Sequence, residues 1–416
     1  MFSTHTPLDI NNSTLISIQK PGKEVGPMKN QRPIALLTTM RKTLSIITLN
    51  RSRADTEEYL AHSQSGFRPN RSTADVVWTH RFLAAKAQKE KMEIYITGID
   101  MSAAFDTIRR DKLLRTAEEF LQEDETRLIR FLLSGTNISP RIPGATRSDS
   151  FEANIGTPQG DSLSPVLFII YLEKALKNVR NEIPQDMTPS EVCYADDCDF
   201  ISDKTFADID RIEPILGNDC LYTNKDKTEY TTLKRDNDRS KETWRNAKKV
   251  GSLIGDAEDV KRRKMLASAA LNKLNRMWKH KKPERSTKIK TYKALVKSIL
   301  MYNCSTWGLT KCEWSRIDSF HRKQLKTVLG IRWPTKISNA RLYEITQEEP
   351  ISTTCKRARW TLLGHILRRD ADIPANQAMK FYFQTKAPGF KGAKRITLPI
   401  TLNEDLAEIS TPTPLN

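Results

Sequence analysis

Cysteine is scarce in this chain, and its spacing suits neither disulfide pairing nor zinc. Six cysteines are spread over 416 residues without a C-x-x-C pair. A chain of this length buries enough apolar surface to fold without disulfides, so we expect a reducing compartment. Gaps of eight, nine and thirty-four positions do not match structural zinc sites, so we expect core thiols and helix-face imidazoles at Cys304, Cys312, His321, Cys355 and His365.

Long apolar runs are also missing. The longest, residues 166–172, is far shorter than the ~20 residues that a membrane helix needs. Residues 1–12 have neither a basic start nor an apolar core, so no signal peptide is expected. The sequence has no internal repeat. These absences predict a soluble intracellular protein without a membrane partner, in two or three domains of roughly 100–200 residues each.

Acidic residues are outnumbered, with 50 Asp and Glu against 68 Lys and Arg, a net charge of +18 and a pI of about 9.6. This excess favours a polyanionic partner such as nucleic acid. Residues 234–297 hold 21 of the basic residues and only 7 acidic ones. The two basic runs in this region, residues 261–264 and 279–282, could also be a solvated face or a nuclear-import signal. We predict phosphate contacts there from Lys261, Arg262, Arg263, Lys264, Lys279, Lys281 and Lys282.

Apolar periodicity predicts a mixed α+β fold. Short apolar runs bounded by turn signals predict strands at residues 15–18, 93–99, 192–195 and 198–201. Helical spacing predicts helices at residues 34–51, 111–133, 162–179, 257–282, 286–303, 311–329 and 353–369. Gly330 is a natural residue to end the helix at 311–329, and Pro21-Gly22 predicts a turn.

Two acidic positions indicate chemistry. Asp100 and the pair Asp196-Asp197 each end an apolar strand, where an unpaired buried carboxylate is costly. Mg²⁺ is usually held by one or two carboxylates together with substrate phosphates. Two such ions can clamp an in-line phosphoryl displacement. An Asp-Asp pair alone is weak support, because Asp is common in ordinary turns.

Six sequence blocks, in this order, resemble the reverse transcriptase family and most of all its non-LTR branch. They are KPGK and QRPIALL within residues 15–49, QSGFRPNRST at 64–73, DMSAAFD at 100–106, GTPQGDSLSP at 156–165, YADD at 194–197 and NKDKT at 224–228. Each block is a weak match by itself. Their common order and spacing make the resemblance specific over residues 15–235.

Resemblance continues more loosely downstream. GSLI at residues 251–254 is an imperfect version of the family's primer-gripping turn. Residues 301–309 and 359–369 resemble the C-terminal region of LINE-type polyproteins. Elements of this type usually carry an endonuclease upstream of the polymerase blocks, which here begin almost at once, so we assign no endonuclease.

The resemblance implies a role for each matching residue. Asp100, Asp196 and Asp197 are the implied catalytic carboxylates. With the backbone carbonyl of Met101 they are also the implied ligands of two Mg²⁺ ions, for which Mn²⁺ can substitute. Phe105 matches the ring that excludes a ribose 2′-OH, with core packing as the alternative, and Asp106 is expected to cap or brace its turn. Contacts to the incoming nucleotide are implied for Lys20, Arg32, Arg68, Phe105, Gln159, Gly160 and Lys227, the last also as a general acid.

The implied fold is a right-hand polymerase of α+β class, with a small antiparallel palm sheet and a helical thumb. We expect fingers and palm at residues 1–235, with the fingers drawn from 1–90. A basic helical thumb follows at 236–310, a helical C-terminal region at 311–384 and a disordered tail at 385–416.

The implied reaction joins a primer 3′-OH to a dNTP on an RNA template, and in this branch the primer is typically nicked target DNA. A nuclear or cytoplasmic ribonucleoprotein is the implied setting. An RNA-dependent RNA polymerase remains an alternative, which Phe105 disfavours. A catalytically inactive, element-derived nucleic-acid-binding protein is another, which the intact carboxylates disfavour. An intron maturase or retron polymerase is a nearer variant.

Overall fold

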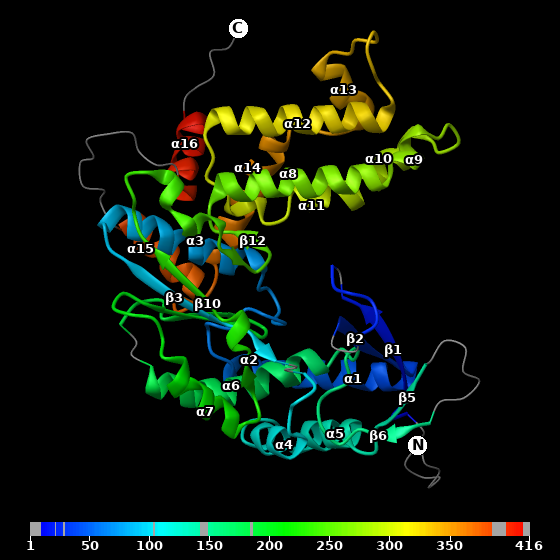
Figure 1. Ribbon diagram of the computed structural model, residues 1–416, viewed down its shortest axis with the longest axis vertical. Coiled ribbons are helices and arrows are strands. Elements are labelled where there is room, and N and C mark those ends of the chain that lie inside the picture. Colours follow the sequence, from blue (N-terminus) through cyan, green and yellow to red (C-terminus); the bar gives the residue numbers. More distant parts are fainter. Residues whose placement is uncertain are drawn as a thin grey trace. The chain divides into compact units, whose positions relative to one another are not determined.

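The computed structural model describes residues 10–20, 22–27, 30–102, 105–141, 149–183, 186–384 and 397–410. The chain divides into two compact units, of which unit 1 comprises Met1–Arg71 and Ile96–Tyr230 and unit 2 comprises Ser72–Tyr95 and Thr231–Asn416. Figure 1 labels their helices and some of their strands. Among the helices in the described ranges, none combines the length and the apolar character that crossing a bilayer requires.

Unit 1 begins with a four-stranded sheet in the order β2-β1-β5-β6. Its strands are β1 (Asn12–Gln19), β2 (Gln31–Leu37), β5 (Asn137–Pro140) and β6 (Phe151–Glu152). β2 pairs antiparallel with β1, and Pro33 lies opposite Ser17. The prediction of a helix starting directly after Pro33 is therefore wrong. Helix α1 (Thr39–Arg51) begins only after Thr38, whose hydroxyl caps it by accepting the Arg41 N–H.

A second sheet has the order β10-β3-β8-β7. It consists of β3 (Ile94–Ile99), β7 (Glu191–Tyr194), β8 (Asp197–Ser202) and β10 (Glu229–Leu233). Two of the three boundaries between the units fall inside β3 and β10. Directly after β3 the chain forms β4 (Met101–Ser102), which pairs antiparallel with β9 (Tyr222–Thr223). The strands predicted before Asp100 and on both sides of the Asp-Asp turn are confirmed.

Helix α6 (Ser164–Glu182) forms the centre of the unit 1 core. Pro165 lies in its first turn, where no backbone donor is lost. Seven consecutive side chains, from position 166 to 172, are buried, as expected for a helix that is apolar all round. α6 packs against α4 (Arg110–Glu118) and α7 (Ile209–Asn218). The remaining helices of this unit are α2 (Arg53–Tyr59) and α5 (Glu123–Leu133).

Unit 2 is mainly helical, and α8 and α12 run side by side in it (Figure 1). Its elements are α3 (Thr73–Glu90), β11 (Lys248–Lys249), β12 (Ser252–Leu253), α8 (Asp256–Lys273), α9 (Asn275–Lys279), α10 (Arg285–Tyr292), α11 (Ser298–Leu300), α12 (Lys311–Leu329), α13 (Asn339–Thr346), α14 (Ile351–Leu367), α15 (Pro374–Gln384) and α16 (Leu398–Ser410). Its core includes Trp278, Tyr292 and Trp307.

The helix predicted at residues 311–329 is confirmed as α12. A capping box between Thr310 and Glu313 starts it, and Gly330 ends it with a left-handed φ of 71°. Other predicted helices are interrupted. The helix expected over 111–133 is two helices, α4 and α5, and three acidic residues in the first turn of α5 favour a new start there. The helix expected over 257–282 likewise divides into α8 and α9.

The predicted domain boundaries also shift. Helix α3, expected in the fingers, packs within unit 2, where Trp78 Nε1 donates to the Ala375 carbonyl at 3.2 Å. The regions expected as a separate thumb and C-terminal region both belong to unit 2. Within the stretch predicted to be disordered, 385–396 and 411–416 lie outside the described residues. The part between them forms α16, which buries Leu398 and Leu402.

Candidate active site

The β7–β8 hairpin carries the acidic turn. Tyr194 pairs with Asp197 in the antiparallel register, which leaves Ala195 and Asp196 as a two-residue turn. Ala195 has a φ of 57°, the left-handed conformation that tight hairpin turns favour. Asp196 is half-buried, whereas Asp197 already belongs to β8 and is exposed. The turn therefore holds the two neighbouring carboxylates in different environments.

Asp100 lies between β3 and β4, and a lysine pairs with it. Lys227 Nζ donates to Asp100 Oδ2 at 2.7 Å. The Asn224 N–H donates to the Asp100 carbonyl at 2.8 Å, so the NKDKT block is anchored directly beside this aspartate. Lys227, predicted to meet the nucleotide and act as a general acid, here neutralises Asp100.

Asp100 and Asp196 share one electrostatic environment. Burial raises the pKa of Asp196, the negative charge of Asp100 raises it further, and Lys227 lowers it. Mutual repulsion between two carboxylates is relieved by a hard divalent cation, which prefers such oxygen ligands. These two residues therefore fit a shared metal ion.

The full set of predicted ligands is only partly brought together. Within the ranges that the structure describes, no three His, Cys, Asp or Glu side chains gather closely enough to hold a metal ion. Asp197 is exposed at the start of β8. The structure thus groups Asp100 with Asp196 but does not complete a triad with Asp197. Met101 is placed next to Asp100 as the first residue of β4.

The GTPQGDSLSP loop depends on two glycines that allow close backbone approach. Gly156 has a φ of 71°, and a Cβ there would lie 2.9 Å from the Asp106 carbonyl oxygen. Gly160 has a φ of 121°, and its Cβ would lie 2.6 Å from the Ala35 oxygen. A larger residue at either position would push the loop off its neighbours. Gly160 therefore seats the loop against β2.

Asp106 and Gln159 are joined within this region. Gln159 Nε2 donates to the two Asp106 carboxylate oxygens at 3.1 and 3.3 Å. Burial raises the pKa of Asp106, while the Gln159 hydrogen bond and the charge of Lys20 lower it. The bond fits the expectation that Asp106 braces its turn, and it places Gln159 and Lys20 near the same carboxylate.

Phe105 is half-buried between two other rings. Its centroid lies 4.5 Å from that of Phe168 in the core and 6.3 Å from that of Phe67, which meets it edge-on. The first contact matches core packing. Because Phe67 is exposed, the pair also presents an aromatic edge at the surface of unit 1.

The predicted triphosphate contacts differ in what surrounds them. Arg32 is exposed on β2 and lies opposite Ile18. Arg68 is buried, and its guanidinium donates to both carboxylate oxygens of Glu57 and to the Ala61 and Gln64 carbonyls. This geometry corrects the nucleotide-binding prediction for Arg68, because its donors are already used to close the chain around residues 57–68.

The predicted nucleic-acid contacts in unit 2 likewise include one buried, ion-paired residue and several more exposed ones. Arg263 is buried, pairs with Asp259 at 3.6 Å and donates to the Gly251 carbonyl, so it supports the β11–β12 turn instead. Arg262 donates to that same carbonyl at 2.8 Å. The other predicted contacts are exposed or half-buried on α8, on α9 and just after it: Lys261, Lys264, Lys279, Lys281 and Lys282.

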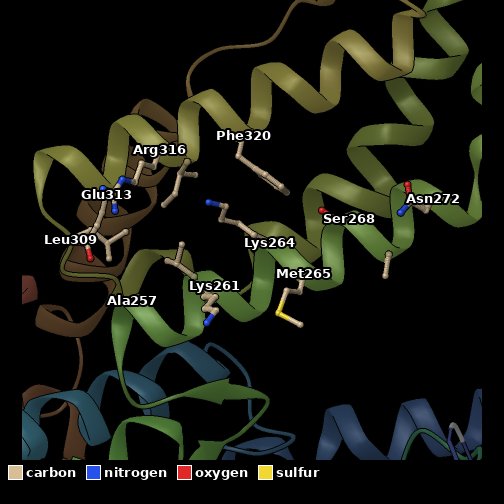
Figure 2. A pocket seen from close by; sticks show the side chains of 13 residues that line it. Ala257, Lys261, Lys264, Met265, Ser268, Asn272, Leu309, Glu313, Arg316 and Phe320 are labelled. Atoms are coloured by element: carbon tan, nitrogen blue, oxygen red, sulfur yellow. The ribbon is translucent and has the colours of Figure 1, made fainter. Parts of the chain in front are cut away.

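A pocket of about 700 Å³ lies between α8 and α12 (Figure 2). Lys261, Lys264 and Arg316 line it together with apolar side chains that include Met265 and Phe320. Two of the predicted phosphate contacts therefore border a hollow with apolar walls.

Three residues that support the loops received no role from the sequence. Arg110 Nε donates to the Gly156 carbonyl at 2.8 Å, and burial, with the nearby charge of Arg41, lowers the Arg110 pKa to about 10. Arg41, fully buried, pairs with Asp161 at 3.3 Å. Gln64 contacts the acidic turn itself. Asp161 and Gln64 lie inside recognised blocks, but no local signal marks Arg41 or Arg110.

The strand-end aspartate, the acidic hairpin turn and the glycine-seated loop define the palm of a right-hand polymerase. The family profile described as reverse transcriptase (RNA-dependent DNA polymerase) matches residues 18–294, well over half of the chain. The chain therefore belongs to the reverse transcriptase family.

Curated relatives come from mobile elements, which confirms the expected non-LTR resemblance. The RNA-directed DNA polymerase from mobile element jockey of Drosophila funebris is 29% identical over 161 residues, 38% of this chain and 18% of that protein. A retrovirus-related Pol polyprotein from type-1 retrotransposable element R2 of Popillia japonica is 28% identical over 155 residues, 36% of this chain and 25% of that protein. The matched part thus spans a quarter or less of each relative.

Two solved structures are more distant. Apo telomerase from Candida tropicalis aligns with a TM-score of 0.43 and 12% identity, covering 91% of this chain and 69% of that one. The RNA-dependent RNA polymerase of a human picobirnavirus, as an insertion-loop deletion mutant, gives 0.45 and 13%, covering 83% and 64%. These likenesses are too weak to bear on function.

Proposed function

We propose that this chain is an RNA-directed DNA polymerase that extends a primer 3′-OH with dNTPs on an RNA template. The observation that carries the proposal is that Asp100 lies close enough to Asp196 for its negative charge to raise the pKa of the Asp196 carboxyl. Membership in the reverse transcriptase family supplies the reaction class.

Mg²⁺ is the proposed cofactor, as two ions, with Mn²⁺ as a substitute. Asp100 and Asp196 would hold it, with Asp197 and the Met101 carbonyl as further ligands. When bound, Mg²⁺ would favour ionisation of the primer hydroxyl and stabilise the leaving pyrophosphate. Lys227 neutralises Asp100 at 2.7 Å, and with a cation held at Asp100 its ammonium group would be available to the triphosphate.

The remaining residues orient the reactants. Arg32, exposed on β2, offers a fork of donors suited to phosphate, and Lys20 lies near Asp106. Gln159 and Gly160 are proposed to face the nucleotide and template, and the Ala35 N–H, which donates to the Gln159 carbonyl at 2.7 Å, holds their loop against β2. Phe105 is proposed to exclude the 2′-OH. The exposed lysines that follow α9 would grip the phosphate backbone of the hybrid without reading its sequence.

A non-catalytic nucleic-acid-binding protein is the second candidate. It is favoured by one observation, that within the described residues no three His, Cys, Asp or Glu side chains gather closely enough to hold a metal ion. Both candidates predict salt-dependent binding of an RNA–DNA hybrid, because each neutralised phosphate releases counterions. Only the first predicts incorporation of a nucleotide.

Primer extension on poly(rA)/oligo(dT) with dTTP and Mg²⁺ separates them. The wild type is compared with Asp196→Asn and with Asp203→Asn, which removes the same charge from an exposed position just after β8. We expect extension by the wild type and by Asp203→Asn, and none by Asp196→Asn. If neither the wild type nor the variants extend the primer while all bind the hybrid, the catalytic proposal fails and the binding protein stands.

Replacing dTTP by UTP in the same reaction tests the RNA polymerase alternative. We expect strong discrimination against UTP. Equal incorporation of both nucleotides would favour an RNA-dependent RNA polymerase.

A further inference from the structure

Gln64 is buried beside the acidic turn, and its side chain binds both backbone polar groups of Ala195. Only 2% of Gln64 is exposed. Its Oε1 accepts the Ala195 N–H at 2.9 Å, and its Nε2 donates to the Ala195 carbonyl at 3.1 Å. Ala195 directly precedes Asp196, so both backbone polar groups next to this carboxylate are bound by one side chain.

The chemistry of a carboxamide suits this position. Ala195 lies in the turn beyond the last ladder pair, Tyr194 with Asp197, so the regular β-ladder does not pair its N–H and carbonyl. A glutamine side chain carries an acceptor and a donor side by side and can satisfy both groups at once. A glutamate would keep the acceptor but lose the donor in its ionised form. An aliphatic side chain would lose both, and leave two buried polar groups unpaired.

Gln64 is itself fixed by the chain around it. Its Oε1 also accepts the Gly66 N–H at 2.7 Å, and its carbonyl accepts from Arg68 at 3.3 Å. The Ser65 N–H donates to the Cys193 carbonyl at 2.8 Å, and the Cys193 N–H donates to the Ser63 carbonyl at 3.0 Å. Residues 63–65 thus form a parallel bridge with β7. The amide is therefore a rigid support for the turn.

Close approach of the backbone reinforces the contact. A Cβ on Gly66 would lie 2.8 Å from the Ala195 Cα, which no real side chain tolerates without a shift. Gly66 therefore lets residues 64–66 approach the turn closely, and the Gln64 amide then fixes the position of the Ala195 backbone. Arg68 holds the same segment by donating to the Ala61 and Gln64 carbonyls.

We propose that Gln64 is a positioning residue that sets where the Asp196 carboxylate lies and so controls metal affinity and the rate of nucleotide addition. Gln64 acts through Ala195 and touches neither substrate nor metal. This proposal rests on the proposed function, because the consequence for nucleotide addition requires that Asp196 carries it. Supporting residues behind metal ligands typically change metal affinity or activity by about 10–100-fold when removed.

Two variants and one control test it in the full-length chain. Gln64→Met removes both hydrogen bonds at similar volume, and Gln64→Glu keeps the acceptor for the Ala195 N–H. Gln324→Met is the matched control, because Gln324 is another buried amide, with 3% exposure, whose Oε1 accepts from Tyr292 in unit 2. Thermal unfolding and hybrid binding establish that each variant is folded.

Three measurements then follow the turn itself. Hydrogen exchange of the peptide covering residues 191–202 is expected to accelerate in Gln64→Met and to change less in Gln64→Glu. Mn²⁺ affinity of the protein–hybrid complex, measured by electron paramagnetic resonance of free Mn²⁺, is expected to fall about 10-fold in Gln64→Met. The kcat for dTTP is expected to fall ~10–100-fold with the affinity for the hybrid unchanged. Gln324→Met is expected to change stability alone.

The outcomes are separable. Wild-type Mn²⁺ affinity and kcat in a folded Gln64→Met would overturn the positioning proposal, even if exchange accelerates. If Gln64→Met does not fold, wild-type Mn²⁺ affinity and kcat in Gln64→Glu would overturn it instead. A wild type that binds Mn²⁺ but incorporates no dTTP would overturn the proposed function. The exchange and Mn²⁺ measurements would still decide whether Gln64 positions Asp196.

Discussion

Adding one methyl group at Gly66 is expected to lower polymerase activity much more than stability. In Gly66→Ala the new Cβ would come closest to the Ala195 N, and it would lie 2.8 Å from the Ala195 Cα and 3.0 Å from the Tyr194 carbonyl carbon. Both are backbone atoms, so no rotamer change moves them aside. Ordinary carbon contacts are about 3.5–4.0 Å, so the turn must retreat by roughly 1 Å.

The size of the effect follows from that displacement. Overpacking of this kind costs roughly 1–3 kcal/mol of stability. A misplacement of about 1 Å in a catalytic group lowers the rate by about 10²-fold. Since Asp196 follows Ala195 directly, we expect kcat for dTTP to fall by about two orders of magnitude, with hybrid binding retained.

Steady-state primer extension and thermal unfolding measure the two quantities separately. The control is Gly217→Ala near the end of α7, where an added Cβ meets nothing within 4 Å and wild-type activity is expected. Wild-type kcat in a folded Gly66→Ala would refute the reasoning, because either the turn yields without consequence or Asp196 does not carry the reaction.

Three further predictions use other parts of the chain. Phe105→Val should raise rUTP incorporation relative to dTTP in primer extension, and unchanged selectivity would remove the gate assignment. Burial opposes ionisation of Glu348, but the neighbouring His321, Lys293 and Lys297 lower the Glu348 pKa to about 2. That stabilisation, roughly 3 kcal/mol, is complete above the unfolded pKa near 4.5 and is lost as the pH falls towards 2. Glu348→Gln should therefore lower the melting temperature at pH 7 and flatten its decline in acid, whereas a parallel decline would contradict this. Lys279→Ala should reduce the salt dependence of hybrid binding without loss of stability, whereas Arg263→Ala should lower the melting temperature; the reverse result would exchange their roles.

Local patterns in the sequence were sufficient to predict an element where the signals for its two ends lie within the element or next to it. Helical spacing and Gly330 predicted α12, and the structure adds a capping box at its start, so the signals for both ends lie within a few residues of the helix termini. The acidic hairpin is similar, since apolar residues on either side of Asp196-Asp197 predict β7, the turn and β8. The six ordered blocks were also sufficient for the family, which the match over residues 18–294 confirms.

Local patterns failed where a distant segment decides the structure. Residues 31–37 continue the apolar pattern of α1, yet they form β2 because β1 offers a ladder of backbone partners. Arg68 looks like a phosphate contact in sequence, but Glu57 and two carbonyls occupy its donors. Arg263 lies in a basic run, and Asp259 with the Gly251 carbonyl turns it inward.

The sequence by itself determined the family, the aspartates at strand ends and turn, and the basic character of residues 234–297. These follow from residue type and order, which the chain carries along its length. Only the tertiary structure decided that Lys227 pairs with Asp100 and that Gln64 supports Ala195. Both contacts join residues more than a hundred positions apart in the sequence. Such contacts arise only when burial of the shared core brings the segments together.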